Sequence, residues 1–207
     1  VGRVQGVPVN PNLGRLAEAK QSLLKAEKIV DQVLTSAAFA GNRRANLTSA
    51  QIAQDAMIVA EMEQRDEDVL KLSRKAAERM NAALAGGPLT PTEVATATRI
   101  FANVALSKSN LHRMDEAVQA AQRSVEIARG VGDDPFQLSK ALGIAANVAR
   151  NAGKAEQALD YVQEARALAE KHADYNSVDF VILYCAVLWR EGLILGELNN
   201  INLNRPK

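Results

Sequence analysis

The residues of this sequence that could do chemistry are few and far apart. The two histidines, His112 and His172, are sixty positions apart, and neither has a second ligand at the spacing of a metal site. Asp133 and Asp134 form an acidic pair that could attract a divalent ion, but Asp134 directly precedes Pro135, as the N-cap residue of a helix does. We therefore expect solvated turn histidines, a capping Asp134, and no metal or cofactor.

Motifs for catalysis are absent as well. The chain has no Walker-type phosphate loop, no G-x-G-x-x-G after a strand, and no H-R-D or D-F-G kinase motif. Serine, histidine and aspartate occur without a pattern that predicts a triad. The single cysteine, Cys185, lies in the apolar run 180–189 and is expected to be buried. A formal glycosylation sequon begins at Asn46 and would carry no meaning in a bacterial protein. The sequence predicts no enzyme.

Composition favours closely packed helices and a protein partner. Apolar residues make up 47% of the chain but aromatic residues only 4%, and alanine, the strongest helix former, dominates the apolar set. With 25 Lys and Arg against 24 Asp and Glu, the chain lacks the basic excess of a nucleic-acid binder. Its longest uncharged apolar run is ten residues, too short to insert into a bilayer. The expected partner is a protein or peptide.

The chain begins with Val1 rather than Met, which indicates an excised domain or a processed product. We expect a soluble domain, with any membrane anchor of the parent protein outside residues 1–207. This leaves both an extracytoplasmic and a cytoplasmic location open.

Helix-capping and helix-breaking residues at regular intervals divide the chain into helices. Apolar residues recur at intervals of three and four, and no segment shows the period of two that marks a strand. Thr90-Pro91 and Asp134-Pro135 each combine a cap residue with a first-turn proline. Thr48 or Ser49 is expected to cap an earlier helix that runs to about Gln64. The prediction is an all-α fold of about seven helices.

Internal repetition distinguishes a solenoid from a bundle. Ala105 and Ala117 are twelve positions apart, and Ala146 and Ala158 repeat this step 41 residues later. These residues resemble the tetratricopeptide repeat family, in which a small residue in helix A lets helix B cross closely and an alanine begins helix B. The resemblance implies an α-α superhelix of antiparallel hairpins. The expected single repeat domain, 1–207, has divergent units in 1–85, two clear repeats in 88–172, and a capping helix in 175–198.

The opening segment 1–14, VGRVQGVPVNPNLG, shows a second resemblance. It is similar to a stretch that precedes a repeat helix in the regions attached to bacterial eukaryote-like serine/threonine kinases. Arg3 stands where that stretch usually has Asp, and Leu23 replaces a Tyr of the following helix. The resemblance implies the regulatory or sensor part of a bacterial signalling kinase whose catalytic domain precedes this chain.

The tetratricopeptide resemblance also implies a binding wall, because exposed positions of each helix A line the inner face of such a stack. Ten positions of this chain fall on that face, and none is acidic. The basic and amide residues among them suit an extended peptide that carries carboxylates. The alternative is an ordinary solvated helix surface. The wall residues proposed for binding are Arg99, Asn110, Lys140, Asn147, Arg150 and Asn151.

The last helix is apolar nearly all round, because Arg190 and Glu191 are its only charges over 180–195. Such a helix requires cover on both sides. The preceding hairpin and the tail 199–207 could supply it, or else a homodimer or absent partner that uses Tyr184, Leu188, Trp189 and Leu193. Gly192 and Gly196 would permit a close helix crossing. The two functional hypotheses are therefore a groove that captures a peptide or partner helix, and an assembly module that acts through this helix.

Overall fold

A computed structural model describes residues 11–130, 134–172, 174 and 176–203. In these residues it has eight helices and no strand, which confirms the all-α fold with one helix more than the expected count. The opening residues 1–10 of the kinase-like segment lie outside the described residues. The helices are α1 (Pro11–Thr35), α2 (Arg43–Met62), α3 (Asp66–Leu84), α4 (Pro91–Asn110), α5 (Met114–Gly130), α6 (Pro135–Asn151), α7 (Ala155–Lys171) and α8 (Val178–Leu203).

Both predicted cap-and-proline signals begin helices. The Thr90 hydroxyl accepts a hydrogen bond from the Glu93 amide, and the Glu93 carboxylate accepts one from the Thr90 amide, forming a capping box. Asp134 accepts hydrogen bonds from the amides of Phe136 and Gln137, each at 3.1 Å. Each cap satisfies amides that the first helical turn leaves without an intrahelical partner.

The predicted start of the second helix is wrong. Helix α2 begins at Arg43, where the Asn42 side chain accepts a hydrogen bond from the Ala45 amide at 3.0 Å, so Thr48 and Ser49 lie inside the helix. Asn46 is 1% exposed and donates to the carbonyls of Ala40 and Asn42. The sequon asparagine is therefore a buried packing residue of the first turn.

Three hairpins, α2–α3, α4–α5 and α6–α7, close with the same turn. Each helix A, the first of its hairpin, ends in a Schellman motif with one residue in the left-handed region. The unit that the sequence shows as degenerate, α2–α3, shares this turn with the two clear repeats. The left-handed residues are Gln64 (φ 56°), His112 (φ 58°) and Gly153 (φ 73°).

Within each hairpin, helix A and helix B approach closely through small residues. Two positions 26 residues apart form the contact in every unit. In α4–α5 the Ser124 hydroxyl donates to the Thr98 carbonyl at 2.8 Å, whereas in α6–α7 the Ser139 hydroxyl donates to the Ala165 carbonyl at 3.1 Å. In α2–α3 the same positions are two alanines, Ala50 and Ala76, and all six residues are buried.

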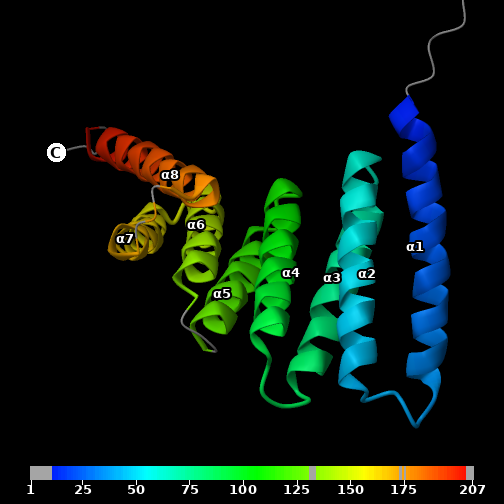
Figure 1. Ribbon diagram of the computed structural model, residues 1–207. Coiled ribbons are helices and arrows are strands. Elements are labelled where there is room, and N and C mark those ends of the chain that lie inside the picture. Colours follow the sequence, from blue (N-terminus) through cyan, green and yellow to red (C-terminus); the bar gives the residue numbers. More distant parts are fainter. Residues whose placement is uncertain (1–10, 131–133, 173, 175, 204–207) are drawn as a thin grey trace, which may run out of the picture.

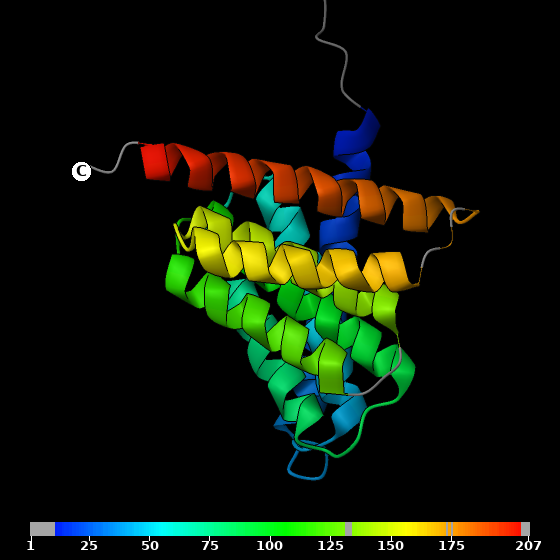
Figure 2. The ribbon, with the colours of Figure 1, turned by 90° about the vertical axis from the view of Figure 1, so that its left-hand side faces the viewer.

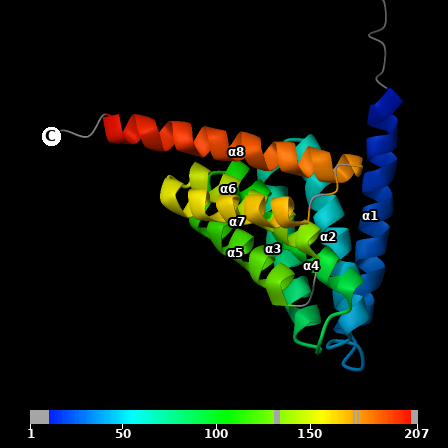
Figure 3. The same ribbon diagram turned by 60° about the vertical axis from the view of Figure 1, so that its left-hand side comes forward.

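The hairpins stack in chain order into a curved array (Figure 1). Helices A contact one another in the series α2, α4, α6 and α8, whereas in the described residues α3, α5 and α7 have no Cα pair within 8 Å of one another. Helices A therefore form the inner wall. Helix α8 occupies the place of a further helix A and lies along α6 and α7 (Figures 2 and 3).

The left-handed turn predicts opposite effects of two substitutions. H112G should raise the free energy of unfolding by about 1 kcal/mol, because glycine adopts positive φ without the steric cost of a Cβ. G153A should lower it by about 1 kcal/mol through φ alone, since no atom lies within 4 Å of an added Cβ. Urea denaturation followed by circular dichroism measures both. Equal shifts of the same sign would contradict the proposed cause.

Candidate functional site

A groove of about 290 Å³ lies on the inner wall between α4 and α6. Its cations, Arg99 and Lys140, are exposed and occupy equivalent positions of consecutive helices A, 41 residues apart. The floor is apolar, the rim carries hydroxyl and amide groups, and no acidic residue lines it. The lining residues are Thr92, Ala95, Thr96, Thr98, Arg99, Ala102, Asn103, Gln137, Lys140, Ala141 and Ile144.

The two cations of the groove have no carboxylate partner among the residues whose placement is described. Neither Arg99 nor Lys140 takes part in a salt bridge with any residue that the structure describes. The Lys140 ammonium lies 4.0 Å from the centroid of the Phe136 ring, a cation–π contact that holds its side chain without neutralising its charge. The groove therefore presents two positive charges, which an anionic ligand can reach.

The other end of the predicted wall is already hydrogen-bonded within the protein. The Asn151 amide donates to the Ser109 hydroxyl at 3.1 Å and so links α6 to α4. Arg150 donates to the side-chain oxygens of Asn147 at 3.4 Å and Asn151 at 3.3 Å. The structure thus separates the six predicted residues. Arg99 and Lys140 line the open groove, Asn110 is exposed at the end of α4, and the remaining three form this network.

Helix α8 supplies two charges that the sequence analysis did not place on this wall. Glu197 lies 3.6 Å from Arg150, so an acid is present where the sequence predicted none. Arg190 passes close to Gly143, where an added Cβ would lie 3.7 Å from its Nη1. Burial, with a smaller contribution from the positive charge of Arg150, lowers the pKa of Arg190. The sequence could have indicated these charges, because α8 follows a complete hairpin and therefore takes the position of a further helix A on the inner wall.

A second cavity, of about 380 Å³, lies between α1, α2 and α3, but all its charged lining residues except Lys71 form ion pairs. Lys75 contacts Glu27 at 2.6 Å and Asp31 at 2.7 Å, and Lys20 contacts Glu63 at 2.9 Å. Burial alone would lower the pKa of Lys75, but hydrogen bonds to the two carboxylates raise it overall. These ion pairs attach α1 to the first hairpin, and they distinguish this cavity from the groove, whose cations are unpaired.

The residues considered for chemistry lie apart. His112 and His172 are exposed at the ends of α4 and α7, as expected of turn histidines. Cys185 is exposed on α8, so its predicted burial is wrong, because the apolar run around it faces the protein on one side only. The described residues contain no group of three His, Cys, Asp or Glu side chains placed to hold a metal ion. Of the described helices, none has the length and apolar character to cross a membrane.

The four residues predicted for an oligomer face divide between two environments. Leu188 and Trp189 are exposed. Tyr184 and Leu193 are half-buried, and the Tyr184 hydroxyl donates to Glu170 of α7 at 3.1 Å while its ring stacks on Phe180. Tyr184 therefore belongs to the contact between α7 and α8.

This architecture, consecutive antiparallel hairpins with helices A along an inner wall, defines the class of α-solenoid repeat proteins. Residues 93–171, which contain the two clear repeats, match the family model described as tetratricopeptide repeat. The match covers the segment from α4 to α7, and tetratricopeptide repeats generally mediate protein–protein interaction.

Solved structures show the same fold over a greater length. The crystal structure of BtubC (BKLC) from P. vanneervenii superposes with a TM-score of 0.58 at 15% sequence identity, covering 93% of this chain and 75% of that one. At this identity the likeness shows the fold alone. Among curated proteins, no sequence matches this chain.

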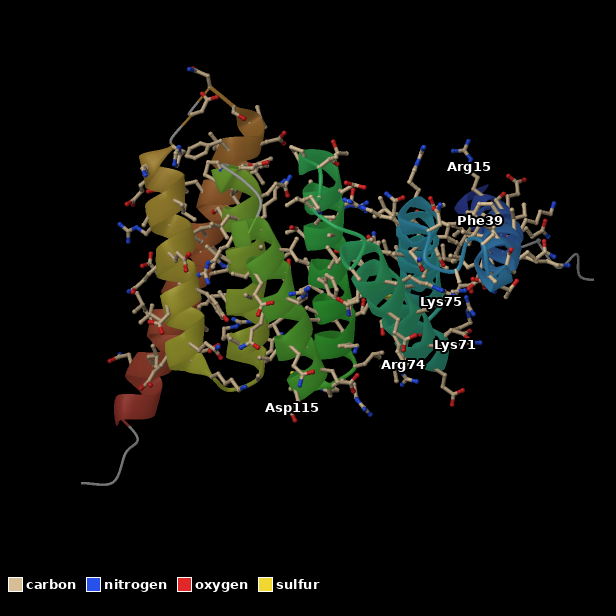
Figure 4. All side chains as sticks on the ribbon, turned by 90° about the horizontal axis from the view of Figure 1, so that it is seen from below. Arg15, Phe39, Lys71, Arg74, Lys75 and Asp115 are labelled. Carbon is tan, nitrogen blue, oxygen red and sulfur yellow. The ribbon has the colours of Figure 1, made fainter. Side chains whose placement is uncertain are left out.

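The ion pairs of Lys75 predict that one substitution can increase local opening of α1 selectively. K75Q should increase amide hydrogen exchange in α1 several-fold, because it removes contacts to both Glu27 and Asp31. K71Q is the matched control, since Lys71 lines the same cavity on α3 without an ion pair (both residues are labelled in Figure 4). Hydrogen exchange with mass spectrometry measures the effect, and equal exchange in α1 of the two variants would contradict it.

Proposed function

We propose that this chain is a protein-interaction scaffold that binds an acidic, extended peptide segment in the groove between α4 and α6. The observation that carries the proposal is the pair of unpaired cations, Arg99 and Lys140, on a wall segment with no acidic lining residue. Tetratricopeptide repeats generally bind protein partners, which agrees with this class of ligand.

The groove can recognise both the charge and the backbone of such a peptide. Guanidinium and ammonium groups form charge-assisted hydrogen bonds with carboxylates, which are about twice as strong as neutral ones. The side-chain amides of Asn103 and Gln137 can each donate to and accept from an extended backbone. The apolar floor, which includes Ala102 and Ile144, leaves room for small side chains between the polar contacts.

The proposal places binding at the Arg99 end of the wall and not at the Arg150 end. Arg150 already contacts Glu197, so a ligand carboxylate there would compete with a carboxylate of the protein. Exposed ion pairs contribute about 0.2–1 kcal/mol each. Two such contacts give a modest affinity that depends on salt, as suits a scaffold that exchanges partners.

A narrower role follows from the opening segment 1–14, which resembles the repeat regions attached to bacterial serine/threonine kinases. If a kinase domain precedes Val1 in the parent protein, the groove would be its sensor or docking part. The sequence of the parent gene tests this role independently of the binding measurements.

The binding test pairs each acidic peptide with a neutral counterpart. An array of seven-residue peptides containing Asp and Glu is compared with the same peptides carrying Asn and Gln. The chain should bind acidic members more tightly, and binding should weaken several-fold as NaCl rises from about 0.05 to about 0.3 M, since salt screens exposed charges. Equal binding to acidic and neutral peptides would refute the proposal.

Charge reversal in the groove identifies the site. R99E and K140E should each weaken binding of the selected acidic peptide by about two- to thirtyfold, because each removes an attraction and adds a repulsion of similar size. R74E is the matched control, since Arg74 is an exposed, unpaired cation in mid-helix on α3, outside the groove (labelled in Figure 4). If R74E lost binding while K140E kept it, the site would lie on α3 and not in the groove. Fluorescence anisotropy provides the measurement.

A further inference from the structure

We infer that two copies of this chain associate through their α8 helices, which pack antiparallel about a two-fold axis at the level of Val187. This interaction is separate from peptide binding in the groove and does not rest on it. It uses a line of residues along α8, here called the α8 seam: Val178, Ile182, Cys185, Trp189, Gly192 and Gly196.

The α8 seam is an apolar face without cover from any residue that the structure describes. Val178 is 73% exposed, Ile182 62% and Trp189 64%, although each is a large apolar side chain. The seam advances by alternating steps of four and three residues, which keeps all six positions on one face of a helix. Scattered exposed apolar residues are ordinary, but a contiguous patch of this kind marks an interaction surface.

Three of the four charged side chains in the described part of α8 lie against helices of the same chain, and the fourth, Asp179, is exposed in the first turn beside Val178. Glu191 contacts Arg166 of α7 at 3.0 Å, and Glu197 contacts Arg150 of α6. Arg190 lies against Gly143 of α6. Two copies can therefore bring the central part of their seams, from Ile182 to Gly192, together without burying an unpaired charge, which would oppose association.

The order of large and small residues along the seam makes it complementary to itself. In an antiparallel pair of helices, residues equally far on either side of the two-fold axis face one another. With the axis at Val187, Trp189 faces Cys185 of the second copy. The same axis places Ile182 opposite Gly192 and Val178 opposite Gly196. Each large side chain thus faces a small residue, and no atom of the described chain lies within 4 Å of an added Cβ at either glycine.

The exposed apolar area of α8 corresponds to a small interface that associates reversibly. Val178, Ile182 and Trp189 of the seam, together with Val181, Leu188 and Leu195 beside it, expose roughly 600 Å² per copy, so a pair would bury at most about 1,200 Å², the lower end of specific interfaces. Trp189, at the middle of the patch, is the residue type most enriched among binding hot spots. A two-fold pair is also closed, which limits association to two copies.

The first experiment measures the mass of the full chain by sedimentation equilibrium over about 1–100 μM. The expected result is a reversible dimer of twice the 22.3 kDa chain. A monomer throughout would overturn the inference. An open-ended series of masses would also overturn it, since that indicates a head-to-tail contact of α8 with another surface. I29D is the control, because Ile29 is an exposed apolar residue of α1 and its replacement should leave the dimer intact.

The second experiment distinguishes steric complementarity of the two seams from nonspecific association of apolar surfaces. G192L adds apolar surface but fills the space that receives Ile182 of the second copy, so the dimer dissociation constant should rise at least tenfold. The monomer has room for this side chain at a helical position, so folding, checked by circular dichroism, should be preserved. I182A combined with G192L exchanges the large and small positions and should restore the dimer. Tighter association of G192L alone would overturn the proposed register.

The third experiment fixes the register chemically. W189C places a second thiol opposite Cys185 of the other copy, so mild oxidation should yield a disulfide-linked dimer on a non-reducing gel. The unsubstituted chain should not crosslink, because its two Cys185 residues are offset by about 6 Å along the axis in addition to the distance between helices. Crosslinking of the unsubstituted chain with none in W189C would overturn the axis at Val187.

Discussion

The close approach of helix A and helix B through small buried residues is the constraint on which the structure depends. Alanine and serine at the contact positions, such as Ala50, Ala76 and Ser124, leave space for only a short distance between helix axes. Where a serine is present, it donates to a carbonyl of the facing helix, and the donor lies on helix B in one unit and on helix A in the next. The position of the contact is therefore kept while its chemistry varies. A larger side chain there would separate the hairpin, because a packed interior cannot absorb the added volume.

The candidate groove is a consequence of that packing. Because helices A contact one another while helices B diverge, the array curves and the exposed residues of α4 and α6 converge on the inner wall. Arg99 and Lys140 share this wall although they are 41 residues apart. The charges between α1 and α3 also converge, but most of them form ion pairs, as Lys75 does with Glu27 and Asp31. What distinguishes the candidate site is thus a pair of cations that no carboxylate of the described residues neutralises.

Helix α8 shows how one element can close a structure on one side and leave it open on the other. Its inward side chains, including Val187 and Ile194, are buried, and its two glutamates form ion pairs with Arg150 and Arg166. Its outward side carries the α8 seam, where apolar side chains remain exposed. The helix completes the wall at the Arg150 end, which confines the proposed peptide site to the α4–α6 groove, and it presents a separate surface for association.

The sequence by itself determined the all-α fold, the capping of α4 and α6, and the similarity of the hairpins α4–α5 and α6–α7, because helix caps, periodicity and a constant repeat interval are local signals. It also indicated that the last helix lacks charge over most of its length. Only the tertiary structure decided which charges are neutralised, since the approach of Glu197 to Arg150 depends on how α8 packs against α6. It likewise decided that Cys185 is exposed and that α2–α3 closes like its neighbours. These features depend on which helices meet in space, and no spacing along the chain contains that information.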